Sequence, residues 1–376
     1  MGKIRYVIVG SGWRSLYYVR IAKALPDIFE LCAMLCKSSE KAQRMSAEYG
    51  IYTTTSIKEC QGMKPDFVVV AVNKDDIAKV SMEWMNYGFT VLCETPAALD
   101  IGTLKQLWEF HKAGKKLAVA EQYTRYPTYE AILKLLKTGI IGDSYSVNIS
   151  LAHDYHGASL MRAFLGQSAD MQFAVSAKTY EFPTTETLNR YERFTDGRIS
   201  PKKRTVATFE FADGKAAFYD FDSEQYRSPI RNNYLKIQGC LGELKDDTIY
   251  YLDKNYQDAK AVLVTKDRYL FTGNSNPNLS RVREIVSIDV RQEENDGIST
   301  HNVYKAAFGE CGLTEDETAI ARLMVDVSRY GRNENVEEQS RALREALQDA
   351  YTAILMAKAV KSGETVSSEV QPWQYE

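Results

Sequence analysis

The chain has 376 residues, of which 44% are hydrophobic and 26% charged, and its formal net charge is −3. This length suggests two domains of about 100–200 residues each, and the composition is that of a globular protein. The near balance of charge argues against nucleic acid or an anionic membrane as the main partner. The longest apolar stretch is also far too short to cross a bilayer.

The first 125 residues alternate strand-like and helix-like segments. Short apolar runs predict strands at 6–9, 29–35, 66–72, 89–93 and 116–121. Amphipathic stretches between them predict helices, for which Ser38 or Ser39 and Asp100 are candidate N-caps and Gly50 a candidate terminator. This alternation predicts a mostly parallel sheet covered by helices on both faces.

A different pattern follows residue 125. One more helix is predicted at 128–138, then strands at 145–151, 205–211, 215–220 and 234–238, with a long polar connection over 184–204. Alanines and leucines at helical spacing predict a long helix over 338–360. The chain is therefore expected to be an α/β protein with a parallel-sheet domain over 1–125 and an α+β domain over 126–376.

The cysteines and histidines do not indicate a metal site. The six cysteines contain no Cys-x-x-Cys pair and lie mostly in apolar runs, so reduced, buried thiols in a cytoplasmic protein are expected. His153 and His156 have a spacing that metal ligands use, but no third ligand is evident, and no metal is predicted.

A glycine-rich turn is the first chemical signal. The segment Gly10-Ser11-Gly12-Trp13-Arg14-Ser15 follows the first predicted strand and opens the first helix. In dinucleotide-binding folds the first glycine makes the tight turn and the second lets the backbone approach the pyrophosphate, whose charge the helix N-terminus holds. This context predicts NAD or NADP binding through Gly10, Ser11, Gly12, Trp13 and Arg14. A purely structural turn is the alternative.

The end of the second strand bears on the choice of cofactor. An acidic residue there would bind the ribose 2′-OH of NAD. This chain has Cys36-Lys37-Ser38-Ser39 instead, and the nearest acid is Glu40. Lys37 and Ser38 could hold a 2′-phosphate, so NADP is favoured; a solvent-exposed loop lysine is the alternative. Asn73, after the third strand, could contact the nicotinamide ribose.

Several segments resemble the Gfo/Idh/MocA oxidoreductases, relatives of glucose–fructose oxidoreductase and inositol dehydrogenase. They are the glycine-rich turn, Val91–Pro96, Glu121–Pro127, Gly139–Asp143 and the stretch His156–Gly166, which is similar to the active-site helix of that family. The resemblance covers essentially the whole chain. It implies a Rossmann domain, an α+β domain with a large open sheet that forms a homodimer or homotetramer, and hydride transfer between NAD(P) and a sugar, polyol or related carbonyl. It also places Glu94 and Gln122 among the cofactor-binding residues.

Two departures from the family pattern affect the chemistry. Where the family has Glu-Lys-Pro, this chain has Glu94-Thr95-Pro96, and an unactivated hydroxyl is a poor acid or base near neutral pH. The family histidine aligns with His156, but the acids that flank it are replaced by Ala152 and Ser159.

A rebuilt acid–base site is one interpretation of these changes. We expect His156 to transfer the proton, because histidine titrates near pH 7, and Thr95 to orient the substrate. Asp154 would assist if 153–156 is extended, since residues two apart then face the same way. The alternative is that Asp154 caps the next helix. Tyr123 and Tyr155 are reserve proton-transfer candidates.

The expected function is therefore NAD(P)-dependent oxidation or reduction of a small, carbohydrate-derived substrate. The missing lysine leaves two alternatives open. One is a non-catalytic NAD(P)- and sugar-binding regulatory protein, a role that the yeast galactose-pathway repressor illustrates within the family. The other is an NAD-assisted glycosidase.

Overall fold

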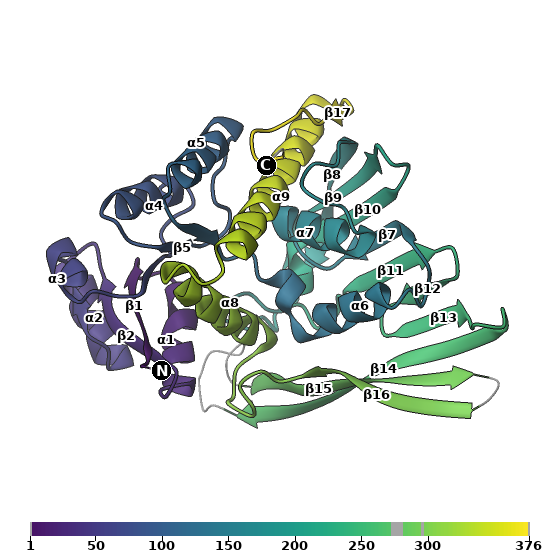
Figure 1. Cartoon of the computed structure of the whole chain (residues 1–376), viewed down its shortest axis with the longest axis horizontal. Coiled ribbons are helices and arrows are strands. Elements are labelled where there is room, and N and C mark those ends of the chain that lie inside the picture. Colours follow the sequence, from purple (N-terminus) through teal and green to yellow (C-terminus); the bar gives the residue numbers. More distant parts are fainter. Residues whose placement is uncertain (1, 272–280, 295–296, 375–376) are drawn as a thin grey trace. The chain divides into compact units, whose positions relative to one another are not determined.

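The computed structural model describes residues 2–271, 281–294 and 297–374, which divide into two compact units (Figure 1). Unit 1 comprises Met1–Gln122, Asp316–Tyr351 and Gln371–Glu376. Unit 2 comprises Tyr123–Glu315 and Thr352–Val370. The first crossing lies close to the predicted division at 125/126. The sequence prediction differs in assigning all of 126–376 to the second domain, whereas the segment 316–351 belongs to unit 1.

Unit 1 contains a parallel sheet of six described strands in the order β3-β2-β1-β4-β5-β6. Its strands are β1 (Ile4–Val9), β2 (Phe29–Leu35), β3 (Thr53–Thr54), β4 (Phe67–Val70), β5 (Val91–Cys93) and β6 (Leu117–Val119). Its helices are α1 (Ser15–Ala24), α2 (Ser39–Tyr49), α3 (Ile57–Gly62), α4 (Ile77–Asn86), α5 (Ile101–Lys112) and most of α8 (Glu315–Gly331) and α9 (Val336–Ser362). This arrangement confirms the predicted Rossmann fold.

Local sequence signals set the helix ends in unit 1. The Ser38 hydroxyl accepts the Lys41 N–H at 3.2 Å and caps α2, which ends at Gly50 with φ of 60°. Asp100 caps α5 by accepting the Thr103 N–H at 2.9 Å. These caps were predicted because Ser and Asp side chains satisfy N–H groups that the first helical turn leaves unbonded.

Helix α8 packs in unit 1 through contacts that are remote in sequence. The Lys116 ammonium group donates to the Gly331 carbonyl at the end of α8, at 2.7 Å. A Cβ on Gly331 would lie 3.0 Å from the Asp66 carbonyl, so a glycine allows close approach here. No local pattern signals such contacts, which explains why the prediction assigned this segment to the other domain.

Unit 2 is built on a sheet of eleven described strands in the order β16-β15-β14-β13-β12-β11-β7-β10-β9-β8-β17. Pairing is antiparallel except between β7 and β10. The strands are β7 (Ser144–Ser150), β8 (Phe173–Thr185), β9 (Ile199–Phe211), β10 (Ala216–Asp222), β11 (Tyr234–Gly239), β12 (Gly242–Lys245), β13 (Thr248–Leu252), β14 (Asp258–Phe271), β15 (Arg281–Glu294), β16 (Gly297–Lys305) and β17 (Val366–Ser367). The expected α+β domain with a large, mostly antiparallel sheet is confirmed.

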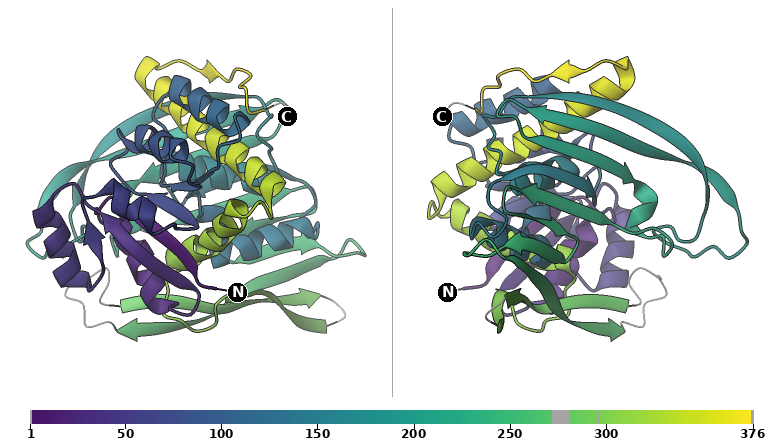
Figure 2. Two further views of the ribbon diagram at one scale, coloured as in Figure 1. Left: turned by 60° about the vertical axis from the view of Figure 1, so that its left-hand side comes forward. Right: turned by 90° about the vertical axis from the view of Figure 1, so that its right-hand side faces the viewer.

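The helices of unit 2 lie against one face of this sheet (Figure 2). They are α6 (Pro127–Lys137) and α7 (Asp154–Leu165), with single turns η1 (Tyr123–Arg125) and η2 (Ser223–Tyr226). Val147, Ile149 and Phe209 are buried on that face. Every second residue of β11 and β13 is buried, as expected of a sheet covered on one side.

The segment 184–204 was predicted to be a polar connection, but both of its ends belong to strands. Strands β8 and β9 pair from Phe173↔Phe211 to Thr185↔Ile199, so the two strands extend well into that segment. Polar cross-strand contacts stabilise the ribbon, including the ion pair between Lys202 and Glu186 at 2.8 Å. Among residues 181–185 and 199–203 only the Thr184 side chain is buried, so these ends of the strands carry no apolar alternation that the sequence could reveal.

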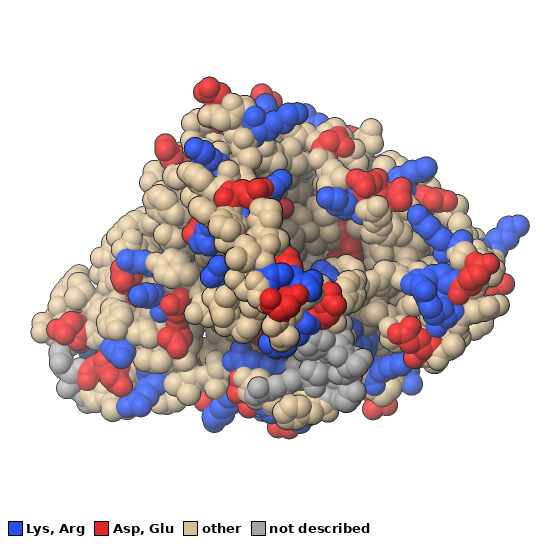
Figure 3. All heavy atoms as spheres, turned by 180° about the vertical axis from the view of Figure 1, so that it is seen from behind, with Lys and Arg blue, Asp and Glu red and all other residues tan. Residues whose placement is uncertain are grey.

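Charge is distributed evenly over the surface that Figure 3 shows. Acidic and basic side chains of the described residues are interspersed on that face, as the small net charge suggests. Within the described residues, no helix has the combination of length and apolar character that crossing a membrane requires.

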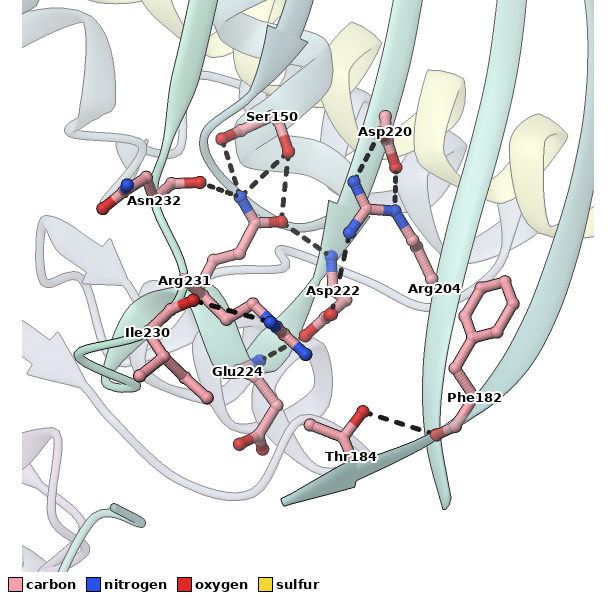
Figure 4. A network of polar contacts seen from close by, with 11 residues as sticks. Ser150, Phe182, Thr184, Arg204, Asp220, Asp222, Glu224, Ile230, Arg231 and Asn232 are labelled. Carbon is pink, nitrogen blue, oxygen red and sulfur yellow. Dashed lines mark hydrogen bonds and ion pairs between the residues drawn. The ribbon is translucent and has the colours of Figure 1, made fainter. Parts of the chain in front are cut away.

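A buried amide organises the turn that follows β10. Gln225 donates to the Ser150 and Asn232 carbonyls at 3.1 and 3.0 Å, and its Oε1 accepts the Asp222 N–H at 3.1 Å. Asp222 in turn accepts the Glu224 N–H at 2.7 Å, which completes a capping box around η2. Figure 4 shows these partners beside the ion pair of Arg204 with Asp220.

Replacing the Gln225 amide should destabilise this turn. Gln225→Leu leaves the buried Asp222 N–H and Ser150 hydroxyl without these partners, and each unsatisfied buried group costs about 1–3 kcal/mol. We expect the free energy of unfolding to fall by roughly 2–3 kcal/mol in chemical denaturation. Arg231→Ala is the control, because Arg231 bonds its neighbour's carbonyl at 3.5 Å, and its effect should stay within about 0.5 kcal/mol. Equal effects of the two variants would contradict the assignment.

Candidate active site

The glycine-rich turn joins β1 to α1 and leaves an open cradle. Gly10 has φ of 113°, and a Cβ there would lie 2.3 Å from the Ala71 carbonyl oxygen. A Cβ on Gly12 would meet no heavy atom of the described chain within 4 Å. Arg14, the N-cap of α1, makes no side-chain capping bond within the described residues. An exposed glycine backbone at a helix N-terminus fits the pyrophosphate of a dinucleotide.

The other residues of the turn are also placed by the structure. Trp13 is 44% exposed, whereas Trp84, Trp108 and Trp373 are fully buried. The Ser11 side chain hydrogen-bonds Cys36 at the end of β2, which partly offsets the increase in the pKa of that thiol caused by burial. The exposed Trp13 indole therefore lies on the turn that is expected to contact the cofactor.

Three predicted cofactor residues meet in one buried polar network. Arg14 Nε donates to Glu94 at 2.8 Å, and the Tyr18 hydroxyl donates to the same oxygen at 2.6 Å. Arg14 Nη1 donates to Asp316 at 2.7 Å, and the Gln122 amide donates to Asp316 at 2.9 Å. Burial opposes the charge on Arg14, but Asp316 and Glu94 raise its pKa well above the usual value. Asp316 was missed because no local motif marks it.

The residues at the end of β2 meet an acid from another loop. Lys37 Nζ lies 3.7 Å from a carboxylate oxygen of Asp76, the N-cap of α4. Asn73 is exposed, and its carbonyl accepts the Asp76 N–H at 2.9 Å. Ser38 is occupied as the cap of α2. Asp76 was not predicted to bind the cofactor, because it follows β4 and not β2.

Thr95 lies directly after the buried Glu94. Its backbone N–H donates to the Glu94 carboxylate at 3.4 Å, and its side chain is half-buried. The turn is thus held by the same carboxylate that binds Arg14.

Unit 2 brings both predicted histidines together in an aromatic cluster. His156 is 5% exposed and its ring centroid lies 4.2 Å from that of Tyr123, 4.9 Å from His153 and 4.4 Å from Tyr155. His153 Nε2 lies 3.1 Å from the Tyr155 hydroxyl. Both reserve candidates, Tyr123 and Tyr155, therefore contact the predicted proton-transfer residue.

Tyr226, which sequence reasoning missed, is bound to His153 twice. Its hydroxyl oxygen accepts the His153 backbone N–H at 3.0 Å and lies 2.5 Å from His153 Nδ1. Burial, and then the neighbouring His156, lower the pKa of His153 to about 4, and Asp154 opposes this shift. The imidazole is therefore neutral at pH 7, and its Nδ1 can accept a hydrogen bond from the Tyr226 hydroxyl. No local sequence signal marks Tyr226 as a partner of His153, because the two residues are 73 positions apart.

Asp154 is not aligned with His156. The expectation of an extended segment is wrong, because α7 begins at Asp154, and residues two apart on a helix point in different directions. Nor is Asp154 the N-cap, a position that His153 occupies. Asp154 is exposed with φ of 40°, and its N–H donates to the Tyr219 hydroxyl at 3.1 Å. A left-handed residue at the start of a helix stores strain, which is typical of functional sites.

The sequence of the first domain is similar to that of a known family. Residues 4–122 match the model of the Gfo/Idh/MocA oxidoreductase family with an NAD-binding Rossmann fold. No functionally curated protein is similar in sequence. Residues 4–122 therefore match the NAD-binding Rossmann domain of this family, which confirms the resemblance for that part of the chain.

Solved structures with this fold cover nearly the whole chain. The WlbA dehydrogenase of Chromobacterium violaceum, solved with NADH and UDP-GlcNAcA, has a TM-score of 0.61 at 16% identity over 99% of this chain and 97% of its own. An Agrobacterium radiobacter oxidoreductase with NAD+, L-tartaric acid and magnesium has a TM-score of 0.62 at 13% identity, covering 97% and 98%. A Thermotoga maritima oxidoreductase has a TM-score of 0.62 at 17%, covering 97% and 98%. At these identities the likeness shows the fold.

The two glycines of the turn should respond differently to substitution. Gly12→Val places a branched side chain in the open cradle, so we expect loss of NAD and NADP binding in titration calorimetry with an unchanged melting temperature. Gly10→Ala is the contrast, because its Cβ would clash with the Ala71 carbonyl at a positive φ. It should lower the free energy of unfolding by more than about 1 kcal/mol. Wild-type dinucleotide affinity in Gly12→Val would overturn the cradle assignment.

Proposed function

We propose that this protein is an NAD(P)-dependent oxidoreductase that interconverts a hydroxyl and a carbonyl group on a sugar, polyol or related small molecule. The open glycine turn of unit 1, in a segment that matches an NAD-binding oxidoreductase family, carries the proposal. The fold similarity to WlbA, which was solved with a nucleotide sugar, supports a carbohydrate-derived substrate.

The reaction needs a group that handles one proton. The nicotinamide cofactor, when bound, accepts or supplies the hydride. Oxidation of an alcohol removes a hydride with its electron pair from carbon and a proton from oxygen, so a base must take that proton. His156 is the proposed base, and it returns the proton in the reverse direction. Its burial against Tyr123 and Tyr155 limits access of water and holds the ring in one orientation.

Thr95 and Asp154 have lesser roles in this proposal. Thr95 orients substrate through a hydrogen bond, since its hydroxyl does not titrate near pH 7. Asp154, exposed at the start of α7, contributes charge near the histidine pair and opposes the lowering of the His153 pKa.

A second function is favoured by one observation. The family lysine is replaced by Thr95, which removes a group able to polarise the substrate oxygen. A protein that binds NAD(P) and a sugar without turnover would keep the glycine turn and need no proton-transfer residue. The two functions differ in whether a sugar and polyol panel produces any change in nicotinamide absorbance.

The role of His156 can be measured directly. His156→Asn keeps size and polarity but cannot titrate, so kcat should fall by about 10²–10⁴-fold, the usual contribution of positioned acid–base catalysis. The dissociation constant of the cofactor should stay unchanged. His301→Asn, at an exposed position on β16, is the matched control and should leave kcat as in the wild type.

Two outcomes would reject parts of this proposal. Activity of His156→Asn within about threefold of wild type would remove His156 from proton transfer. Turnover that arises only in Thr95→Lys, in a protein otherwise inactive, would establish the non-catalytic function.

Assembly through the open face of the unit 2 sheet is part of the same proposal. Tyr180, Val206, Phe218 and Tyr250 share that face by strand register, and each is at least 40% exposed. The family resemblance assigns this face to a second copy of the chain. Light scattering should show a dimer or tetramer, and Phe218→Glu should shift it toward monomer by placing a charge in the interface. Tyr256→Glu, exposed before β14, is the control. A wild-type monomer at micromolar concentration would contradict the proposal.

A further inference from the structure

The loops after β2 and β4 meet above the end of β1. In the sheet order β3-β2-β1-β4, the strands β2 and β4 flank β1 on either side. Their carboxyl ends lie at the same edge, because all three strands are parallel. The pair Lys37–Asp76 joins these loops, beside the glycine turn that leaves β1. Ligands of parallel α/β sheets bind at this edge.

The features that favoured NADP in the sequence are engaged elsewhere in the structure. The Ser38 hydroxyl accepts the Lys41 N–H at 3.2 Å. The pKa of the exposed Glu40 is lowered by its own backbone N–H and then by the Ser38 hydroxyl, so that hydroxyl donates to a carboxylate. The Ser38 hydroxyl is therefore occupied as both acceptor and donor, and one of its partners carries a negative charge.

Asp76 supplies the acid that the end of β2 lacks. It is the N-cap of α4, yet its carboxylate makes no capping bond within the described residues and instead lies 3.7 Å from Lys37 Nζ. The Asp76 N–H bonds the Asn73 carbonyl, which holds the turn that presents this carboxylate. Lys37 is 89% and Asp76 49% exposed, so both side chains are accessible to a ligand.

We propose that Asp76 determines cofactor choice and makes this protein prefer NAD over NADP. The carboxylate accepts a hydrogen bond from the ribose 2′-OH of NAD. It repels a 2′-phosphate, which carries a charge of about −1.5 to −2 at pH 7, and it pairs with Lys37, a lysine at the end of β2 that would attract that phosphate. The assignment rests on the proposed function only in that a dinucleotide must bind at the glycine turn.

The experiment measures binding and needs no substrate. NAD and NADP are titrated separately into the full-length protein by calorimetry, with the fluorescence of the exposed Trp13 as a second readout. Wild type should bind NAD more tightly. Asp76→Asn keeps a residue suited to the N-cap but removes the charge, so the ratio of NADP to NAD affinity should rise at least about tenfold, or about 1.4 kcal/mol.

Two further variants isolate the cause. Asp75→Asn removes the same charge from the adjacent exposed residue and should change the ratio less than about twofold, because general surface charge is screened by solvent. Lys37→Ala combined with Asp76→Asn should cancel the gain in NADP affinity, since the freed lysine is then absent.

The outcomes separate this inference from the proposed function. The role of Asp76 alone is overturned if dinucleotide binds but Asp76→Asn leaves the ratio of NADP to NAD affinity unchanged. A wild-type preference for NADP overturns that role as well. Binding of neither dinucleotide overturns both the role of Asp76 and the oxidoreductase proposal. An equal shift in Asp75→Asn would assign the effect to net charge and overturn the specific role.

Discussion

Unit 1 depends on the ion pairs that the buried guanidinium of Arg14 makes. It joins the glycine turn to the carboxylate after β5 and to Asp316 at the start of the returning segment. Gln122, the last residue before the chain leaves unit 1, bonds the same Asp316. Charges this well buried are expensive unless fully paired, and removing one partner typically costs about 3–5 kcal/mol. The network therefore holds the glycine-rich turn together with the two nearby points at which the chain leaves and re-enters unit 1.

This arrangement changes how the motif residues are understood. Arg14 and Glu94 lie in segments that resemble cofactor-binding motifs, yet in the structure they bind each other. Their side chains thus link the glycine turn to the turn after β5. Gly12 and Trp13 of the same turn have exposed positions, and the Trp13 ring lies against Tyr17.

In unit 2 the candidate proton-transfer residues lie where the strands meet α7. The amide of Gln225 fixes η2, and η2 presents Tyr226 to His153. The neutral His153 ring lies between the hydroxyl groups of two tyrosines. It can both donate and accept a hydrogen bond but carries no charge at pH 7. A chain without the family lysine thus has a set of hydrogen-bond donors and acceptors around His156 that comes from three separate segments.

The sequence by itself determined the regular parts of the protein. Buried apolar runs, Ser38 and Asp100 caps and the Gly50 terminator are local signals, so β2, α2 and α5 could be predicted nearly to the residue. The glycine turn was also local, and it was sufficient to predict a dinucleotide-binding domain. His156 was found because its neighbours align with a family pattern.

Only the tertiary structure decided which side chains meet. Asp316, Asp76 and Tyr226 come from segments remote from their partners, and no periodicity or cap signals a contact across many residues. The direction of Asp154 depended on whether its segment is extended or helical, and in the structure its N–H, at the start of α7, donates to the Tyr219 hydroxyl on β10. Long-range polar contacts are chosen by the packed sheet and helices, because burial makes each unpaired polar group costly only once the chain is folded.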